Sequence, residues 1–162
     1  MIKIIVAVDE NGSIGKDNDL LYYIKDDLKN FKNLTSGNIV VMGKNTWDSL
    51  PVKPLPNREN IVLTTTNKEL IGAKVLSSFE ELESYLKNTE KDIYIIGGAS
   101  IYNQVIENKL VDEAHVTFVK DTVKDAEKFI DIDKLKELLP KENYVTSFEQ
   151  DGLKADYIIL SK

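Results

Sequence analysis

The chain has 162 residues, of which 42% are hydrophobic and 30% are charged, a composition that suits one globular domain and excludes a wholly disordered chain. It contains no cysteine and one histidine, which excludes disulfides, thiol chemistry and a metal site built from those residues. The formal net charge of -6 argues against nucleic-acid binding, and the short apolar start is too brief for a signal peptide or membrane span, so we expect a cytoplasmic protein.

The first part of the chain carries a strand pattern, a long loop pattern and a helix pattern. A nearly continuous apolar run predicts a buried strand at residues 2–8. Residues 9–23 are rich in glycine, asparagine and aspartate and predict a loop; its apolar Ile14 and Leu20 fit either a functional loop or a surface loop pinned to the core. Apolar residues at helical spacing then predict a helix at residues 24–34, which Gly37 ends.

Strand and helix patterns alternate through the middle of the chain. Strands are predicted at residues 39–42, 60–63, 74–76 and 93–96, and helices at 44–49, 78–86 and 99–106. This alternation predicts right-handed crossovers and a mainly parallel sheet. Lysines interleaved with acidic residues between 124 and 141 indicate a solvated face.

The last third changes from the parallel to the antiparallel pattern. Alternation predicts a strand at 114–119, and strands at 144–150 and 153–160 flank Asp151 and Gly152, a pair suited to a type I′ turn. We therefore expect an α/β fold in one domain over residues 1–162. It has a central, mostly parallel twisted sheet, helices on both faces and a C-terminal antiparallel hairpin.

The first candidate for chemistry is Asp27. On a helical wheel it falls within the apolar stripe of the 24–34 helix, whereas Asp26 points well away. A carboxylate in apolar surroundings needs hydrogen-bond donors or a cationic partner, which a nitrogenous ligand can supply. The alternative is that Asp27 only complements the helix dipole in the first turn.

The second candidate is the glycine-rich junction after the strand at 93–96. Gly97, Gly98 and Ala99 let backbone N–H groups at a helix N-terminus approach an anion such as a pyrophosphate. The junction lacks the full GxGxxG spacing, so a tight turn that uses glycine for close packing is the alternative. Gly43 and Lys44 repeat the arrangement after another strand, and two such junctions in one sheet can hold the two ends of a dinucleotide.

Three single residues stand out by their rarity. Arg58 is the one arginine among 21 basic residues, and its planar fork suits a carboxylate, although an ordinary surface role is the alternative. We predict that Trp47 lies in the core and that His115, which has no neighbour for a metal site or catalytic set, is structural. No Walker A motif, nucleophile elbow or suitably spaced acidic pair is present, so hydrolase chemistry is disfavoured.

Taken in order along essentially the whole chain, these pieces resemble dihydrofolate reductase. Six segments carry the resemblance: the opening strand with Ala7, Ser13-Ile14-Gly15 to Asn18, Asp27-Leu28-Phe31, Val41-Met42-Gly43 to Thr46-Trp47-Ser49-Leu50, Pro54-Leu55-Pro56-Asn57-Arg58, and Ile96-Gly97-Gly98 to Tyr102. Each one alone is a weak signal, but their order is specific.

The resemblance implies a substrate site for dihydrofolate and for antifolate-like molecules. Asp27 would bind the 2-amino-pyrimidinone edge of the pterin with Thr117 hydrogen-bonded behind it, and Arg58 would clamp the α-carboxylate of the glutamate tail. Asp27 and Tyr22 are the catalytic candidates; Leu21-Tyr22 stands where many members carry Pro-Trp. The implied substrate-binding residues are Ile5, Asp27, Leu28, Phe31, Leu50, Leu55, Arg58, Ile96 and Thr117.

The resemblance also implies NADPH as cofactor and the loop at residues 9–23 as a lid over its nicotinamide. Lys44 stands where an arginine often faces the 2′-phosphate, Ser100 replaces another frequent arginine, and the usual Gly-Asp-Thr near residues 124–129 is altered. The implied cofactor-binding residues are Ala7, Ser13, Ile14, Gly15, Asn18, Leu20, Gly43, Lys44, Asn45, Thr46, Leu63, Thr64, Thr65, Ile96, Gly97, Gly98, Ala99, Ser100, Ile101 and Tyr102.

The hypothesis that follows is a monomeric enzyme, without metal, that transfers a hydride from NADPH to C6 of 7,8-dihydrofolate while N5 gains a proton. Two alternatives remain at this point. One is a pyridine-nucleotide reductase of the same fold, such as the pyrimidine reductase of riboflavin synthesis. The other is a non-catalytic dinucleotide-binding module, which does not explain an acidic residue on an apolar helix face.

Overall fold

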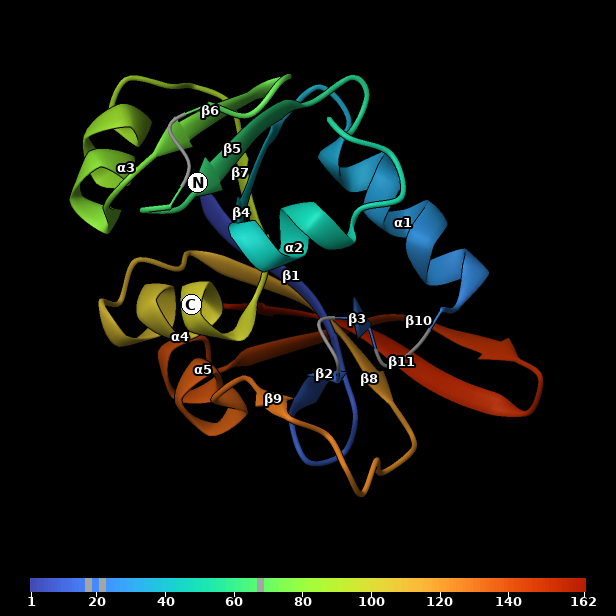
Figure 1. The fold of residues 1–162 in the computed structure, drawn as a ribbon. Helices are drawn as coiled ribbons and strands as arrows, with labels where there is room; N and C mark the ends of the chain where they lie inside the picture. Colours follow the sequence, from blue (N-terminus) through green and yellow to red (C-terminus); the bar gives the residue numbers. More distant parts are fainter. Residues whose placement is uncertain (17–18, 21–22, 67–68) are drawn as a thin grey trace.

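The computed structural model describes residues 1–16, 19–20, 23–66 and 69–162. Its centre is an eight-stranded sheet with the strand order β10-β11-β8-β1-β7-β4-β5-β6 (Figure 1). The strands are β1 (Ile2–Val8), β4 (Ile39–Gly43), β5 (Glu59–Leu63), β6 (Ala73–Leu76), β7 (Ile93–Gly97), β8 (Glu113–Val119), β10 (Lys141–Gln150) and β11 (Leu153–Ser161). The helices are α1 (Lys25–Thr35), α2 (Lys44–Ser49), α3 (Phe79–Leu86), α4 (Ala99–Glu107) and α5 (Ile132–Leu138).

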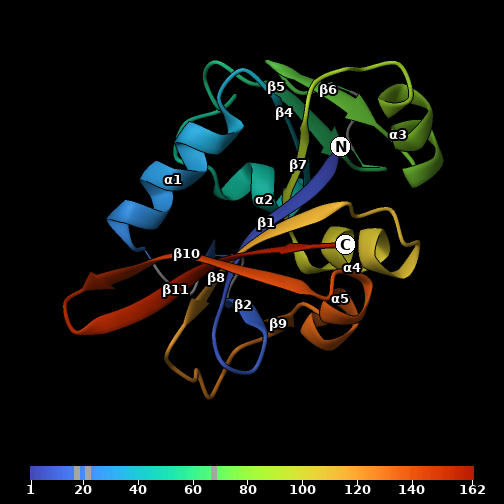
Figure 2. The same ribbon diagram turned by 180° about the vertical axis from the view of Figure 1, so that it is seen from behind.

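The sheet is parallel from β8 to β6 and antiparallel at its C-terminal end, which confirms the predicted fold class. β1 pairs in parallel with both β7 and β8, whereas β11 runs antiparallel to β8 and to β10. Asp151 and Gly152 have φ values of 54° and 82°, as a type I′ turn requires. The resulting hairpin extends from the body on the side opposite α3 (Figures 1 and 2).

Two apolar layers cover the two faces of the sheet. One layer joins the buried side chains of β1, β4 and β7 to α3, α4 and α5, and includes Val105 and Leu135. The other joins Val40, Met42 and Tyr94 to Trp47 of α2 and Leu34 of α1. Helices on both faces were predicted, and Trp47 is a core residue, as expected. The candidate site residues of α1 therefore share a face with α2.

Short elements after residue 8 correct the prediction of a plain loop at residues 9–23. β2 (Ser13–Lys16) and β3 (Asp19–Leu20) pair with each other, and β2 also pairs with β9 (Lys128–Phe129), forming a small sheet at one end of the molecule (Figure 1). These strands have two to four residues, and the pairing of β2 with β9 joins residues more than 100 positions apart in the sequence. Local periodicity cannot reveal such strands.

The sequence analysis also missed α5. Asp131 caps this helix by accepting a hydrogen bond from the Lys134 N–H at 3.1 Å, and Leu135 is fully buried. An Asp at the cap position followed by leucines at helical spacing indicates a helix, but the many lysines of this stretch led to its interpretation as a solvated face. Four of the five lysines in this stretch are exposed, as predicted, whereas Lys134 is half-buried.

Candidate active site

Asp27 lies in the first turn of α1 and faces β8. The Thr117 hydroxyl of β8 donates a hydrogen bond to Asp27 Oδ1 at 2.5 Å, an interaction the family resemblance had implied. Burial raises the pKa of Asp27, and the hydrogen bond from Thr117 acts in the opposite direction. A carboxyl group that served only the helix dipole would not need to be buried, so this contact favours the functional interpretation.

The apolar stripe of α1 is covered only in part. Leu28 is 42% exposed and Phe31 is partly buried. Thr35 is the fully buried residue of the helix. Because Leu28 is exposed next to Asp27, α1 has an accessible apolar surface beside a half-buried carboxyl group.

Arg58 is held against the other end of α1. Its Nε donates to the Pro56 carbonyl at 2.9 Å, its Nη1 donates to Thr35 Oγ1 at 3.1 Å, and its guanidinium lies 5.9 Å from the centre of the Phe31 ring. Among the described residues, Nη2 has no hydrogen-bond partner. The orientation of the arginine is thus fixed, and the N–H groups of Nη2 remain available to donate hydrogen bonds to a bound carboxylate.

The glycine junctions after β4 and β7 touch each other. A Cβ built on Gly97, whose φ is +138°, would lie 3.0 Å from Thr46 Oγ1, whereas one on Gly98 would meet the same oxygen at an ordinary 3.6 Å. A Cβ on Gly43 would lie 3.5 Å from Ile101 Cγ1. The missing side chains leave a cradle between α2 and α4 that larger residues would fill.

The N-terminus of α4 offers backbone donors at this cradle. The first intrahelical hydrogen bond runs from the Tyr102 N–H to the Gly98 carbonyl at 3.0 Å, so the N–H groups of Ala99, Ser100 and Ile101 precede the intrahelical ladder. An anionic group placed over Gly98 would meet these donors and the positive end of the helix dipole. The donor set fits a pyrophosphate.

Tyr102 connects this cradle to Asp27. Its hydroxyl donates to the Ile5 carbonyl at 2.8 Å, and a Cβ on Gly97 would lie 3.7 Å from the same hydroxyl oxygen. Burial raises the pKa of Tyr102, and the negative charge of Asp27 raises it further. Tyr102 therefore lies between the glycine cradle and β1 and is influenced by the charge of Asp27.

The start of the proposed lid is anchored by Asp9, which is almost fully buried. Its carboxylate accepts backbone hydrogen bonds from Asn11, Ser13 and Val123, each at 2.9 Å. Burial acts to raise the pKa of Asp9, but these donors outweigh it and hold the pKa below the ordinary value. Asp9 thereby ties β2 to the segment after β8.

The predicted lid residues lie only partly in the described structure. Ser13 and Ile14 are buried, and the Gly15 carbonyl accepts from the Glu127 N–H at 3.1 Å. Asn18 and Tyr22 lie outside the described residues, and only the backbone of Leu20, in β3, is described.

The remaining predicted substrate-site residues cluster on the α1 face. Ile5 and Ile96 of the sheet pack with Leu50 and Leu55 against the layer that contains Trp47. Ala7 is paired with Thr117 across β1 and β8. The structure thus brings together four of the six apolar residues that the resemblance assigned to the folate pocket; Leu28 and Phe31 of α1 are not in this cluster.

The residues assigned to the adenosine end of the cofactor lie more openly. Asn45 and Thr65 are exposed, Leu63 packs against the α4 side of the sheet, and Thr64 Oγ1 lies 3.0 Å from Thr66 Oγ1. Lys44 Nζ lies 2.7 Å and 2.8 Å from the two carboxylate oxygens of Asp48. A phosphate approaching Lys44 therefore competes with an existing ion pair.

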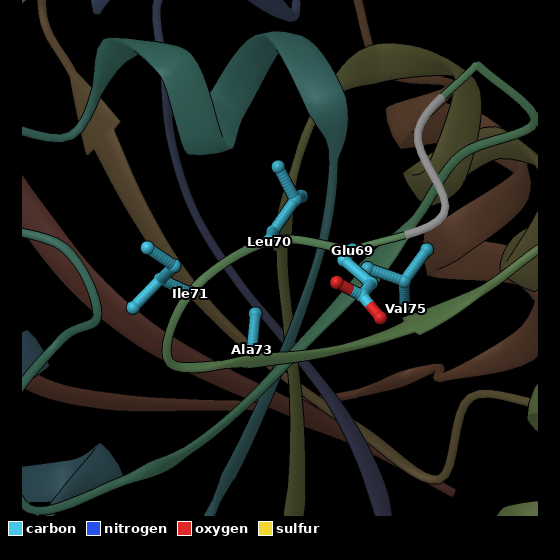
Figure 3. Close-up of a pocket in the computed structure, with 5 residues that line it drawn as sticks. All are labelled: Glu69, Leu70, Ile71, Ala73 and Val75. Carbon is cyan, nitrogen blue, oxygen red and sulfur yellow. The ribbon is translucent and has the colours of Figure 1, made fainter.

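A shallow depression of about 240 Å³ lies elsewhere, at the β6 edge of the sheet. Figure 3 shows Leu70 and Ile71 pointing apart around it, with the Glu69 carboxylate beside Val75. None of the predicted site residues lines it. Its one charged lining group is negative and would repel a phosphate, so this depression does not suit the cofactor.

Two residues that support the site were missed from the sequence. Thr35 accepts from Arg58 while its own hydroxyl donates to the Phe31 carbonyl at 2.8 Å, and Asp9 organises the lid start. A threonine on the apolar side of α1 was a readable signal for Thr35. The partner of Asp9 at Val123 is 114 residues away and had no local signal.

These features define a class of protein: an α/β fold with a half-buried carboxyl group beside the central sheet and a glycine-lined cradle at the C-terminal ends of two parallel strands, the place where such folds bind nucleotides. A family model for dihydrofolate reductase matches residues 1–162. The chain belongs to the dihydrofolate reductase family.

Individual relatives agree with the family match. The chain is 32% identical to the dihydrofolate reductase of Bacillus subtilis (strain 168) over 163 residues, which covers 100% of this chain and 95% of that protein. It is 38% identical to the dihydrofolate reductase of Neisseria gonorrhoeae over 134 residues, covering 82% and 81%. A structure of dihydrofolate reductase from Enterococcus faecalis, complexed with NADP(H) and RAB-propyl, is similar with a TM-score of 0.82 and 29% identity over 99% of this chain and 95% of that chain.

Two other kinds of site are absent from the described residues. No described helix is long and apolar enough to cross a membrane. Within the same part of the chain, no group of three or more histidine or acidic residues is placed to hold a metal ion.

Proposed function

We propose that Asp27 anchors the pterin in the activity of this family, the NADPH-dependent reduction of 7,8-dihydrofolate to 5,6,7,8-tetrahydrofolate. The observation that supports this role is the half-buried Asp27 carboxyl group, which accepts a hydrogen bond from Thr117 and lies next to the exposed Leu28. A buried carboxylate gains most from a ligand that donates hydrogen bonds, as a 2-amino-pyrimidinone edge does. Leu28 and Phe31 supply an apolar wall for the flat ring.

Arg58 takes the glutamate tail in this proposal. Its contacts with Pro56, Thr35 and Phe31 already fix the guanidinium, so little side-chain entropy is lost when it binds a carboxylate. The α-carboxylate of the tail would meet the Nη edge of the fork with charge-assisted hydrogen bonds.

The residues around the glycine cradle fit NADPH. Ala99, Ser100 and Ile101 would bind the pyrophosphate through their N–H groups, and Lys44 would face the 2′-phosphate. When bound, the cofactor supplies the hydride that is transferred to C6 of the pterin. Thr46 and Tyr102 border the cradle on the side of Asp27 and limit where the nicotinamide can lie.

Asp27 also assists protonation at N5. Its negative charge raises the basicity of a nearby ligand nitrogen, so it favours the protonated pterin even if the proton itself comes from water. We place Ser13, Ile14, Gly15 and Tyr22 in the lid that keeps bulk water from the reacting atoms. The protein contributes alignment and electrostatics, and the cofactor contributes the redox chemistry.

The test is the pH dependence of Asp27→Asn. At pH 7 and above, kcat/KM for dihydrofolate should fall by roughly 10²–10⁴-fold, the range that proton-handling groups contribute. The loss should shrink at acidic pH, where the substrate arrives already protonated. Asp26→Asn is the matched control, because Asp26 is exposed and adjacent, and it should leave kcat/KM within about 2-fold. An equal loss at all pH values for Asp27→Asn would contradict the role.

Further parts of the proposal concern partners and location. We place the protein in the cytoplasm as a monomer that binds dihydrofolate and antifolate-like molecules and does not bind nucleic acid. The net charge of -6 supports the last point. NADPH oxidation that depends on added dihydrofolate, and not on the pyrimidine intermediate of riboflavin synthesis, separates this function from the same-fold alternative.

A further inference from the structure

Asn60 of β5 carries a buried amide two residues after Arg58. The residue is 3% exposed, so its side chain is shielded from solvent. Oδ1 accepts a hydrogen bond from the Leu55 N–H at 2.9 Å, and Nδ2 donates to the carbonyls of Leu55 and Arg58, each at 3.0 Å. Both donors and one acceptor position of the amide are thus committed to a single segment, residues 55–58, which we call the 55–58 loop.

The 55–58 loop depends on partners outside itself because it is rich in proline. Pro54 and Pro56 have no N–H, so the Leu55 N–H is the one backbone donor of residues 54–56, and Asn60 accepts its hydrogen bond. The loop contains neither a helix nor a strand. Its shape is therefore set by a side chain rather than by a backbone ladder.

All four carbonyls of the 55–58 loop have a hydrogen-bond partner. Asn60 is the partner of the first and of the last. The two between them accept from Arg58 Nε at 2.9 Å and from the Gly37 N–H at 2.8 Å. The loop is therefore held by β5, by its own arginine and by the turn that follows α1.

The Arg58 guanidinium takes its orientation from this loop. Its Nε bonds to the Pro56 carbonyl inside the loop, and its Nη1 bonds to Thr35 Oγ1 on α1 at 3.1 Å. The Arg58 backbone is held by Asn60 through the Arg58 carbonyl. A change in loop shape would move both the Nε acceptor and the base of the side chain relative to Thr35, so the fork could no longer meet both of its acceptors.

The two ends of the loop depend on Asn60 to different degrees. Leu55 packs against the apolar layer that contains Trp47, and this packing holds its end of the loop without the amide. Arg58 instead lies over the half-buried Phe31 ring, with the guanidinium carbon 5.9 Å from the ring centre. Loss of the amide should therefore displace the Arg58 end more than the Leu55 end.

We propose that Asn60 is a positioning residue for dihydrofolate binding: its amide closes the 55–58 loop and thereby sets the orientation in which Arg58 receives the α-carboxylate of the glutamate tail. The inference rests on the proposed function, in which Arg58 takes that tail. Asn60 contacts neither the substrate nor the reacting atoms in this scheme. It acts on the affinity for ligands that carry the tail and leaves hydride transfer unchanged.

The first experiment measures the orientation of Arg58 without a ligand. Arg58 is the one arginine of the chain, so a ¹H–¹⁵N spectrum contains a single Nε–H signal. Asn60→Ser offers one hydrogen to donate in place of two, so it cannot bond both carbonyls. The substitution should speed exchange of the Nε–H with water by about 5-fold, the effect of one weakened hydrogen bond. Unchanged exchange would overturn the proposal.

The matched control is Asn103→Ser on α4. Asn103 bonds two backbone groups as Asn60 does: its Oδ1 accepts from the Asp131 N–H and its Nδ2 donates to the Phe129 carbonyl, each at 3.0 Å. Both substitutions remove an amide that joins separate elements, so both should lower Tm. Only Asn60→Ser should speed Nε–H exchange. Equal effects on that exchange would show general loosening of the fold and would refute the proposal.

The second experiment compares dihydrofolate with a pterin substrate that lacks the glutamate tail. Asn60→Ser should raise KM for dihydrofolate by about 5-fold, whereas kcat, KM for NADPH and KM for the tailless pterin should change less than about 2-fold. Asn103→Ser should leave the ratio of the two pterin KM values unchanged. If Asn60→Ser raised KM equally for both pterins, the positioning role would be wrong.

A double substitution tests whether Asn60 acts through Arg58. In an Arg58→Ala background no guanidinium remains to be oriented, so adding Asn60→Ser should raise KM for dihydrofolate no further. A second rise, as large as the one that Asn60→Ser causes in the wild-type background, would show that Asn60 acts independently of Arg58. That result would overturn the proposal.

The wild-type protein provides a test that does not require a variant to fold. If the amide closes the loop in solution, the Leu55 N–H and the Asn60 side-chain N–H groups should exchange with water as slowly as the paired backbone N–H groups of β5. Exchange of these groups at the rate of an exposed amide would refute the proposal.

Failure of this inference can be told from failure of the proposed function. If Arg58→Ala leaves KM for dihydrofolate unchanged, the role of Arg58 in tail binding is wrong. If Arg58→Ala raises that KM while Asn60→Ser changes neither the KM ratio nor the Nε–H exchange, only the positioning role of Asn60 is wrong.

Discussion

In the proposed function, the two halves of the active site recognise their ligands by opposite means. The dihydrofolate half would use two charged side chains, Asp27 and Arg58, that are oriented by the buried hydroxyl groups of Thr117 and Thr35. The NADPH half would use backbone N–H groups at the start of α4, where glycines leave room for the cofactor.

This difference determines which kind of substitution weakens ligand binding in each half. In the dihydrofolate half, removing or reshaping one charged group removes a specific contact and leaves the fold in place. The NADPH half has few side chains whose removal would weaken binding, so we expect function to be lost when a substitution adds atoms to the cradle. Substitutions that remove a side-chain group should therefore weaken dihydrofolate binding, and substitutions that add a side chain to the cradle should weaken NADPH binding.

The largest effect in this comparison, after Asp27→Asn, is expected for Arg58→Lys. An ammonium keeps the charge but loses the planar fork and its contacts with Thr35 and Pro56. KM for glutamate-bearing dihydrofolate should rise by roughly 10–100-fold, as expected for a lost charge-assisted pair. Steady-state kinetics with a pterin that lacks the tail is the control, and a comparable rise for that compound would show that Arg58 does not read the tail.

Gly98→Ala tests the opposite half. The new Cβ meets Thr46 Oγ1 at 3.6 Å, an ordinary contact, so the fold and Tm should be unchanged while KM for NADPH rises by about 5–10-fold through lost approach to the α4 N–H groups. Gly97→Ala differs because φ is +138° there and the Cβ would lie 3.0 Å from the same oxygen, so it should also lower Tm. If Gly98→Ala raised KM for dihydrofolate and not KM for NADPH, the assignment of this glycine to the NADPH half would be contradicted.

We also expect Asp27, in the dihydrofolate half, to lower the free energy of unfolding of the ligand-free protein at neutral pH. Because burial raises the native pKa of Asp27, the folded chain binds its proton more tightly than the unfolded chain, so this group makes the free energy of unfolding fall as pH rises. Asp27→Asn should raise Tm of the ligand-free protein at pH 7 by a few degrees at most, and the gain should vanish below the ordinary carboxyl value of 3.8. Calorimetry across pH measures this, and a lower Tm for Asp27→Asn at pH 7 contradicts it.

The smallest effect is expected at Lys44, where the NADPH half does use a side chain. Asp48 holds Lys44 Nζ in an exposed ion pair, and such pairs are worth about 0.2–1 kcal/mol. Asp48→Asn should free Lys44 and lower KM for NADPH by about 2-fold at low ionic strength, with no change for NADH. A change that is equal for NADPH and NADH, or that persists in high salt, would mean that Lys44 does not face the 2′-phosphate.

The predictability of the site differs from residue to residue. Asp27 was found because its helical phase places a carboxylate among apolar residues, and the glycines were found because they follow strands. The wheel showed which side chains of α1 share a face, but it could not show whether that face is covered, and Leu28 is not. β2, β9 and α5 were missed because they are short and depend on distant partners or on a cap hidden among lysines.

The sequence alone determined the alternation of strands and helices, the positions where glycine is needed, and the order of segments that marks the family. Tertiary structure alone decided which groups meet: Thr117 with Asp27 across 90 residues, His115 with Tyr157 across 42, and Arg58 with Thr35 across 23. The physical reason is that periodicity within one element depends on neighbouring residues, whereas these partners depend on how separate elements pack. A slip of one residue in strand register would turn Thr117, His115 or Tyr157 to the other face of the sheet.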